Sequence, residues 1–174
     1  MKQLTNPKTD NYFALKEYIL SSDLPWFYIE STTYDTDNQT DINIRETGVP
    51  YYSHAILRPP GNPNLFPTQN SPCAELCAKV VSEISDTNNL NINCILRLNA
   101  NLSLPSSRTP TQPHVDHPFP HKNLLIYLTD ADGQTVAGDQ QHFPKEDDVI
   151  TFSGMHYHYL PTSGKRIVIV ATYI

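Results

Sequence analysis

Residues 123–128 read Asn-Leu-Leu-Ile-Tyr-Leu, which is a nearly all-apolar stretch. An apolar run of this length without alternation is typical of a strand that is buried on both faces or beneath a cover. Other short strands are predicted around it, separated by turn-forming segments such as 130–133 and 161–164. They span residues 91–99, 148–152 and 166–174. Short strands at roughly regular spacing indicate a jelly roll or cupin-like double sheet.

The amino-terminal half is predicted to supply helices that support the sheets. Residues 10–21 are expected to form a short helix. A longer helix is predicted to begin with Ser71 as its cap and Pro72 in its first position, and to end near residues 86–89. Strands are also predicted at 24–29 and 51–57, with a polar loop at 32–47 that contains a further strand at 41–45. We therefore expect a mainly β protein with supporting helices, folded as a single domain over residues 1–174.

Composition and charge restrict the possible partners. The formal net charge of −6 makes nucleic acid an unfavourable partner, because a negative surface repels phosphate backbones. No apolar run approaches the roughly 18 residues of a membrane span, and residues 1–8 lack the apolar core of a signal peptide. The three cysteines are an odd number, which favours a reduced, intracellular protein. We expect it in the cytoplasm, or in the host cytoplasm if it is viral. Nothing in the sequence indicates the oligomeric state.

Several histidines, one aspartate and one arginine have a characteristic order relative to the predicted strands. His114-Val115-Asp116 precedes the apolar strand, His156 and His158 follow the strand at 148–152, and Arg166 comes after the next turn. Two imidazoles and one carboxylate on a β scaffold form the facial triad of non-haem Fe(II) oxygenases, which leaves open coordination positions. A nearby arginine can hold the distal carboxylate of a co-substrate.

Residues 90–174 resemble the Fe(II)/2-oxoglutarate-dependent dioxygenases, in particular the prolyl-4-hydroxylase-like branch with its small phage-type members. The matching stretches are 95–99, 114–118, 125–130, 133–135, 148–152, His158 and 164–166. The resemblance implies a double-stranded β-helix that binds Fe(II) at its open mouth and uses 2-oxoglutarate and O₂. It also implies hydroxylation of an unactivated C–H bond, with a prolyl residue in a peptide or protein as substrate and a small molecule as the alternative.

The resemblance also implies a role for each matching site residue. His114, Asp116 and His158 are the implied metal ligands. Arg166 is the implied partner of the distal carboxylate of 2-oxoglutarate, and Tyr127 is expected to donate a hydrogen bond to this co-substrate. The branch that demethylates nucleic acids carries a second arginine six residues after the first, where this chain has Thr172.

The third ligand is open between His158 and His156, because residues two apart in a strand point the same way. His158 lies six residues after Phe152, which is the family spacing. A hairpin turn at residues 161–164 would also place His158 opposite Ile167, beside Arg166. His156 has the more usual spacing of ten residues to Arg166. We predict His158 as the ligand, with His156 as the alternative.

Two other functions remain open at this point. One is a cupin-type metal enzyme that does not use 2-oxoglutarate, and the other is a jelly-roll binding protein whose histidines are coincidental. Arg166 distinguishes both from the 2-oxoglutarate-dependent oxygenase, because neither needs a buried arginine to bind the carboxylate of a co-substrate. His117 and His121 are expected in loops, and His54 and His142 at the surface.

Overall fold

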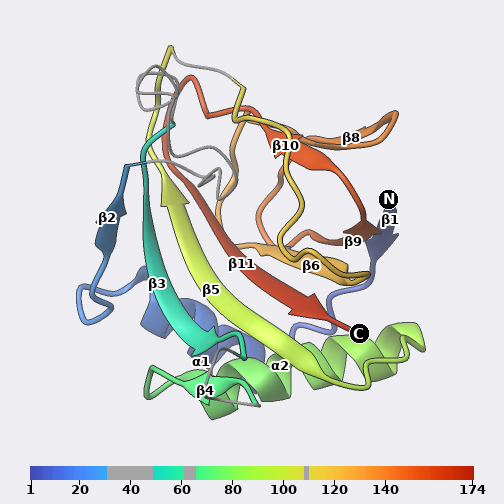
Figure 1. Cartoon of the computed structure of the whole chain (residues 1–174). Coiled ribbons are helices and arrows are strands. Elements are labelled where there is room, and N and C mark those ends of the chain that lie inside the picture. Colours follow the sequence, from blue (N-terminus) through green and yellow to red (C-terminus); the bar gives the residue numbers. More distant parts are fainter. Residues whose placement is uncertain (31–48, 61–65, 108–109) are drawn as a thin grey trace.

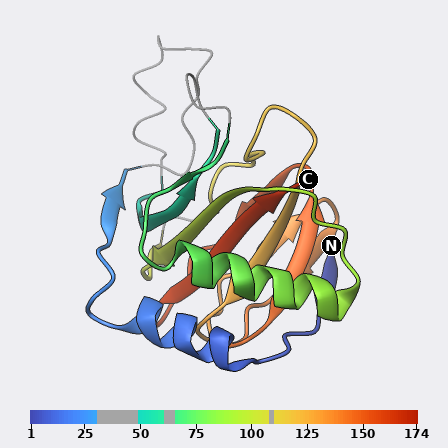
Figure 2. The same cartoon turned by 90° about the horizontal axis from the view of Figure 1, so that it is seen from below.

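The computed structural model describes residues 1–30, 49–60, 66–107 and 110–174. In this part of the chain, two antiparallel sheets face each other and helices cover the outer side of the larger one (Figures 1 and 2). The larger sheet has the order β1 (Lys2–Leu4), β9 (Val149–Ser153), β6 (Lys122–Tyr127), β11 (Arg166–Tyr173), β5 (Ile95–Ser103), β3 (Tyr51–Arg58) and β2 (Phe27–Ile29), with β4 (Thr68–Gln69) beside β3. The smaller sheet has the order β10 (His156–His158), β7 (Thr135–Ala137) and β8 (Gln140–His142). The expected mainly β architecture, a double-stranded β-helix with supporting helices, is confirmed.

The two helices of the described chain are α1 (Asp10–Leu20) and α2 (Ala74–Asn88). α1 follows Thr9, whose hydroxyl accepts a hydrogen bond from the backbone N–H of Tyr12 at 3.2 Å. The predicted start of α2 is wrong, because the cap position is held by Cys73. The hydroxyl of Ser71 instead contacts Nε2 of His54 at 2.8 Å. His54 is therefore buried, and its prediction as a surface residue is also wrong.

The apolar run in β6 is buried on both faces, as predicted. Leu124 and Ile126 belong to the hydrophobic core shared with the helices. Leu125 and Tyr127 belong to a second core that includes Ala137 of the smaller sheet. Each fully buried Leu or Ile side chain stabilises the fold by roughly 1.5–3 kcal/mol. The absence of alternation in the sequence therefore reflects two apolar layers, one on each side of this strand.

β5 gives the larger sheet one apolar and one polar face. Leu98 and Ala100 point into the core under the helices. The alternate residues point into a cavity between the sheets, and they are Arg97, Asn99, Asn101 and Ser103. This strand starts later than predicted and extends further, at Ile95–Ser103 rather than 91–99. The polar side of β5 forms one wall of the candidate site.

The hairpin predicted at residues 161–164 does not form. β10 pairs with β7, with His158 opposite Thr135, whereas β11 lies between β5 and β6 of the larger sheet. The chain between β10 and β11 therefore crosses from one sheet to the other. It passes so close to Gly133 that a Cβ atom there would lie 2.7 Å from the carbonyl carbon of Leu160. The whole loop predicted at 32–47, with its strand at 41–45, lies outside the described residues.

Candidate metal and carboxylate site

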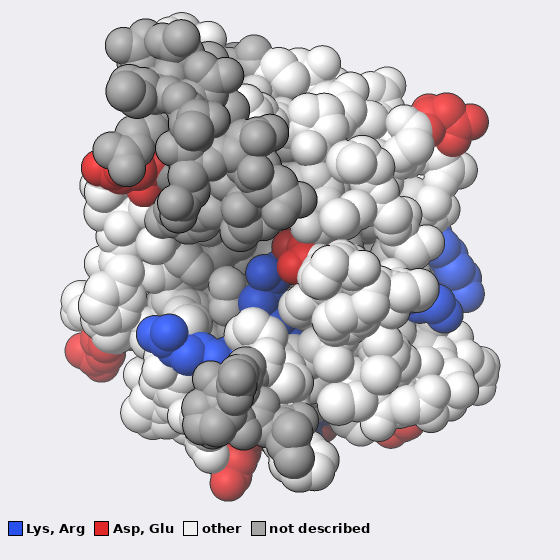
Figure 3. Space-filling model, viewed as in Figure 1, with Lys and Arg blue, Asp and Glu red and all other residues white. Residues whose placement is uncertain are grey.

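The candidate site is a cavity of about 90 Å³ between the two sheets. The face of the molecule seen in Figure 3 is hollowed near its centre, where basic and acidic side chains reach the surface. Polar residues of β5, the segment that follows it, β10 and the start of β11 line the cavity. Its charged residues and histidines are Arg97, His114, Asp116, His156, His158 and Arg166.

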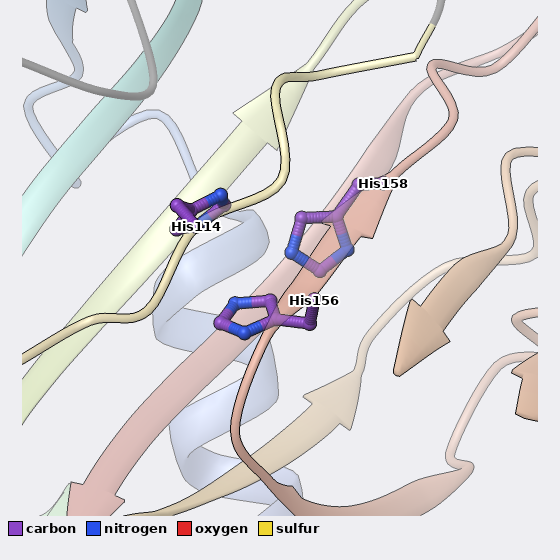
Figure 4. Close-up of side chains that lie close together, drawn as sticks. All are labelled: His114, His156 and His158. Carbon is purple, nitrogen blue, oxygen red and sulfur yellow. The ribbon is translucent and has the colours of Figure 1, made fainter. Parts of the chain in front are cut away.

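Three histidines converge in this cavity (Figure 4). One ring nitrogen from each of His114, His156 and His158 lies within 4.8 Å of the others. The backbones of His114 and His156 are joined by two hydrogen bonds, of 2.9 and 3.0 Å, which fix the HxD segment beside β10. The predicted His114 and both candidates for the third ligand are thus brought together.

His114 and His156 are oriented by backbone carbonyls. Nδ1 of His114 lies 2.9 Å from the carbonyl oxygen of Gln112, and Nδ1 of His156 lies 3.1 Å from that of Gly154. Because a carbonyl oxygen can only accept, Nδ1 carries the proton in both neutral rings. Nε2 of each ring therefore has a free lone pair, which is the arrangement typical of metal-binding histidines.

His158 has different neighbours. Its Nδ1 lies 2.9 Å from Oγ1 of Thr135 and 3.3 Å from Nη2 of Arg166. Burial in the cavity, followed by the charge of Arg166, holds the pKa of His158 well below its usual value. This imidazole is therefore uncharged at neutral pH.

Asp116 lies between Arg97 and His156. Its Oδ1 accepts a hydrogen bond from Nη2 of Arg97. Its buried Oδ2 has no hydrogen-bond partner and lies 3.5 Å from Nε2 of His156. Burial alone would raise the pKa of Asp116, but the charges of Arg97 and His156 and the hydrogen bond from Arg97 lower it below its usual value. The carboxylate is therefore ionised.

Asp116 and His156 together fit a bound cation. Burial lowers the pKa of His156, so this ring is neutral at pH 7 and presents a lone pair at Nε2. The ionised Oδ2 of Asp116 faces the same nitrogen without a proton donor between them. Two acceptors that face each other in a buried position repel unless a cation lies between them. With the Nε2 atom of His114, they form a donor set of two imidazoles and a carboxylate, which suits Fe(II).

Arg166 is buried at 4% exposure and lies in the same cavity. Its Nη2 donates to Oγ1 of Thr135 at 3.1 Å, and its Nε has no hydrogen-bond partner. No carboxylate of the described residues forms an ion pair with it. A buried cation without an anion is costly, so this guanidinium is suited to bind an acid that enters the cavity.

Tyr127 lies behind Arg166, outside the cavity lining. The guanidinium lies over its ring at 5.4 Å from the centroid, and its hydroxyl contacts Oγ1 of Thr135 at 2.7 Å. Burial is the main cause that raises its pKa, so the phenol is neutral. Tyr127 thus contacts both Arg166 and Thr135, which in turn contacts His158.

Arg97 and Thr135 were not predicted as site residues. Arg97 could have been found, because a polar residue at every second position from Arg97 to Ser103 alternates with apolar ones. Thr135 carries no such signal. In the larger sheet Arg97 pairs with Thr172, the position where a second arginine was sought, so β5 supplies a cation at that level of the barrel. His142 lies beside Asp148 at 3.1 Å and is half-buried, so its prediction as a surface residue is wrong.

No helix in the described ranges is both long and apolar enough to cross a membrane. No family model and no curated protein matches the sequence of the chain.

Comparison with solved structures finds proteins of the same fold. A 2OG-Fe(II) oxygenase family oxidoreductase from Burkholderia pseudomallei matches with a TM-score of 0.65 and 15% identity, over 93% of this chain and 78% of its own. The non-heme alpha-ketoglutarate-dependent epimerase SnoN from nogalamycin biosynthesis matches with a TM-score of 0.57 and 12% identity, over 99% of this chain and 76% of its own. A viral collagen prolyl hydroxylase from Paramecium Bursaria Chlorella virus-1 gives a TM-score of 0.47 at 15% identity, over 69% and 78% of the two chains. The first two matches confirm the predicted resemblance to 2OG-Fe(II) oxygenases at the level of the fold.

Proposed function

We propose that the chain is an Fe(II)- and 2-oxoglutarate-dependent oxygenase, an oxidoreductase that hydroxylates an unactivated C–H bond. One observation carries the proposal. The buried Arg166, which has no ion-pair partner among the described residues, shares a cavity with the facing acceptors of Asp116 and His156. The acceptors can bind a metal cation and the guanidinium can bind an acid, so the cavity suits a metal and a keto acid together.

Within this proposal, His114, Asp116 and His156 hold the metal. His156 replaces His158, which the sequence favoured, for three reasons. Oδ2 of Asp116 lies 3.5 Å from Nε2 of His156, and Nδ1 of His156 is held by a carbonyl oxygen as in His114. The hairpin that supported His158 is absent. When bound, Fe(II) with 2-oxoglutarate and O₂ supplies the oxidising chemistry.

The remaining residues bind and orient. Arg166 binds the distal carboxylate of 2-oxoglutarate through parallel hydrogen bonds. Tyr127 supports this arginine through its ring face and through Thr135, rather than by the direct hydrogen bond to co-substrate that the resemblance implied. Arg97 holds Asp116 in its ionised form and in place.

The substrate follows from the sequence resemblance. We propose a prolyl residue in a peptide or protein, with a small molecule as the alternative class. Nucleic acid is an unfavourable partner for a chain of net charge −6. A peptide-library screen, read as a mass gain of about 16 Da per oxygen added, distinguishes these classes, and activity on small molecules alone would reject the peptide substrate.

Succinate production from 2-oxoglutarate with Fe(II) tests the reaction itself. We expect turnover in the wild type and none in Asp116→Ala. Turnover in Asp116→Ala equal to that of the wild type would overturn the proposed site.

Arg166→Ala tests the co-substrate half of the site. Loss of one partner of a buried charge pair costs roughly 2–5 kcal/mol, so we expect 2-oxoglutarate to bind at least about tenfold more weakly. The affinity for Mn(II), a redox-silent substitute, should stay the same, because Arg166 does not contact the proposed ligands His114, Asp116 and His156. Calorimetry measures both affinities, and exposed Lys165→Ala is the matched control. Equal 2-oxoglutarate binding by Arg166→Ala would favour a cupin-type enzyme without this co-substrate.

A further inference from the structure

We infer that His158 positions the co-substrate and selects its length, by donating a hydrogen bond from Nε2 to the keto acid that Arg166 binds. This inference rests on the proposed function. It gives His158 a role that differs from metal binding and that neither the fold nor the HxD motif assigns.

The imidazole of His158 can carry its proton on only one of its two nitrogens here. Nδ1 lies 3.3 Å from Nη2 of Arg166, and a guanidinium can only donate hydrogen bonds. Nδ1 must therefore accept, and in the neutral ring the proton resides on Nε2. The side chain of Thr135 fits the same arrangement. Its oxygen can accept from Tyr127 and Arg166 while its hydroxyl donates to Nδ1 of His158.

His158 thus has the opposite tautomer to its two neighbours. His114 and His156 present a lone pair at Nε2, because carbonyl oxygens hold their Nδ1 protons. His158 presents an N–H at Nε2, which cannot coordinate a metal until the proton leaves. One ring nitrogen of His158 faces the other two imidazoles and the second is turned away from them (Figure 4). Since Nδ1 is the nitrogen bound to Thr135 and Arg166, the N–H edge faces the centre of the cavity.

This position defines what the N–H can meet. His158 contacts Arg166 on one side, and its ring centroid lies 5.4 Å from that of His156 and 6.1 Å from that of His114 on the other. A keto acid that reaches from Arg166 to the proposed metal ligands must pass this ring. An oxygen of the acid can accept the proton of Nε2, and the ring limits how many carbons fit between the two ends.

Two substitutions separate the hydrogen bond that His158 donates from the volume that its side chain fills. His158→Gln places an amide N–H near the position of Nε2, whereas His158→Leu keeps much of the volume but has no donor. A hydrogen bond to a charged acceptor is worth about 1.5–3 kcal/mol, so 2-oxoglutarate should bind His158→Leu roughly tenfold to a hundredfold more weakly. His158→Gln should stay within about threefold of the wild type, since its donor is retained.

Calorimetry with Mn(II) and then 2-oxoglutarate provides the test. We expect both variants to bind Mn(II) like the wild type, and His156→Leu to lose it. Wild type should bind 2-oxoglutarate more tightly than the longer 2-oxoadipate and the shorter oxaloacetate. This difference in affinity should become smaller in His158→Leu and stay the same in His158→Gln. Loss of Mn(II) binding in both His158 variants, or unchanged acid binding in His158→Leu, would overturn the inference. A wild type that binds Mn(II) but no keto acid would instead overturn the proposed function.

A spectroscopic measurement tests the tautomer of His158 in the wild type. Nitrogen-15 NMR of histidine-labelled protein loaded with Zn(II) reports the tautomer of each ring. We expect a protonated Nε2 for His158, assigned by its absence in His158→Gln, and a shift of its proton when 2-oxoglutarate is added. A His158 ring with its proton on Nδ1 would overturn the inference.

Discussion

Arg97 and Arg166 face the same cavity but differ in what they pair with. Arg97 forms an ion pair with Asp116. Arg166 is surrounded by Thr135, Tyr127 and His158, none of which carries a negative charge at neutral pH. The two arginines therefore have different roles. The guanidinium of Arg97 binds a carboxylate of the protein, whereas that of Arg166 is available to a carboxylate from outside.

Arg97→Met should make metal binding more sensitive to acid. Burial alone would raise the pKa of Asp116, and Arg97 is the main cause that lowers it. Without Arg97 the pKa of Asp116 rises, so protons compete with the metal at a higher pH. We expect the Mn(II) affinity of Arg97→Met to fall more steeply than that of the wild type between about pH 7 and pH 5.

The proposed histidine ligands are the same in both proteins, so the difference between the two pH curves reports on Asp116. The exposed Arg58→Met on β3 is the matched control and should follow the wild type. Curves for Arg97→Met and wild type that superimpose would show that Arg97 does not tune this carboxylate.

The residues of the candidate site could be predicted only in part, for a physical reason. His114, Asp116 and Arg166 could be proposed as site residues because their order relative to the predicted strands and turns can be read from the sequence. The choice between His156 and His158 depends on what each Nδ1 contacts. For His156 that partner is a nearby carbonyl, but for His158 it is Thr135 and Arg166 from other strands. Because the two histidines are two residues apart, their positions in the sequence cannot distinguish the rings, whereas the hydrogen-bond partners of their Nδ1 atoms can.

Among the elements, the long strands were predictable, whereas the short β7 and β10 were not. β6 and β11 bury nearly every residue, so their apolar runs stand out in the sequence. β7 and β10 have three residues each and are held by pairing with distant segments rather than by their own pattern. Because β10 was unrecognised, the turn after it was assigned to a hairpin that does not form.

α1 is fastened to the segment before β9 by Asp147. This carboxylate contacts the hydroxyl of Tyr12 and Nζ of Lys16 at 2.5 Å each, and Nζ of Lys8 at 2.9 Å. Burial alone would raise the pKa of Asp147, but these hydrogen bonds and the charge of Lys16 lower it to about 2. The depressed pKa stabilises the folded state above the unfolded pKa of about 3.9, and this stability is lost as the pH falls towards 2.

Asp147→Asn should therefore lower the free energy of unfolding at pH 7 by about 1–2 kcal/mol, after allowance for solvent screening. Asn tolerates the left-handed backbone at this position, where φ is 70°, so the change removes charge without backbone strain. Urea unfolding measures the effect, with exposed Asp139→Asn as the control. The difference from wild type should shrink as the pH falls from about 4 to about 2, and a difference that stays constant would exclude the ionic origin.

At the scale of the whole molecule, the site joins the two sheets. His156 and His158 belong to the smaller sheet, whereas Arg97 and Arg166 belong to the larger one. The proposed metal and keto acid would contact both sheets, which only the folded state brings together, so they should stabilise it by mass action.

Mn(II) with 2-oxoglutarate should raise the Tm by roughly 5–10 °C at about a hundredfold excess over Kd, and a chelator should reverse the shift. Differential scanning fluorimetry measures this, and His114→Ala should show no shift with Mn(II). An equal shift in His114→Ala would place the bound metal elsewhere.

Gly133 has no side chain and no chemistry, yet the chain that links β10 to β11 passes directly over it. Even the single methyl group of alanine would collide with the backbone at Leu160 and Tyr159, which cannot move as a flexible side chain can. The collision would displace the segment that carries His156 and His158 at one end and Arg166 at the other. In a deep mutational scan, Gly133 should therefore tolerate as few replacements as the proposed metal ligands, although its nearest role is only to leave space.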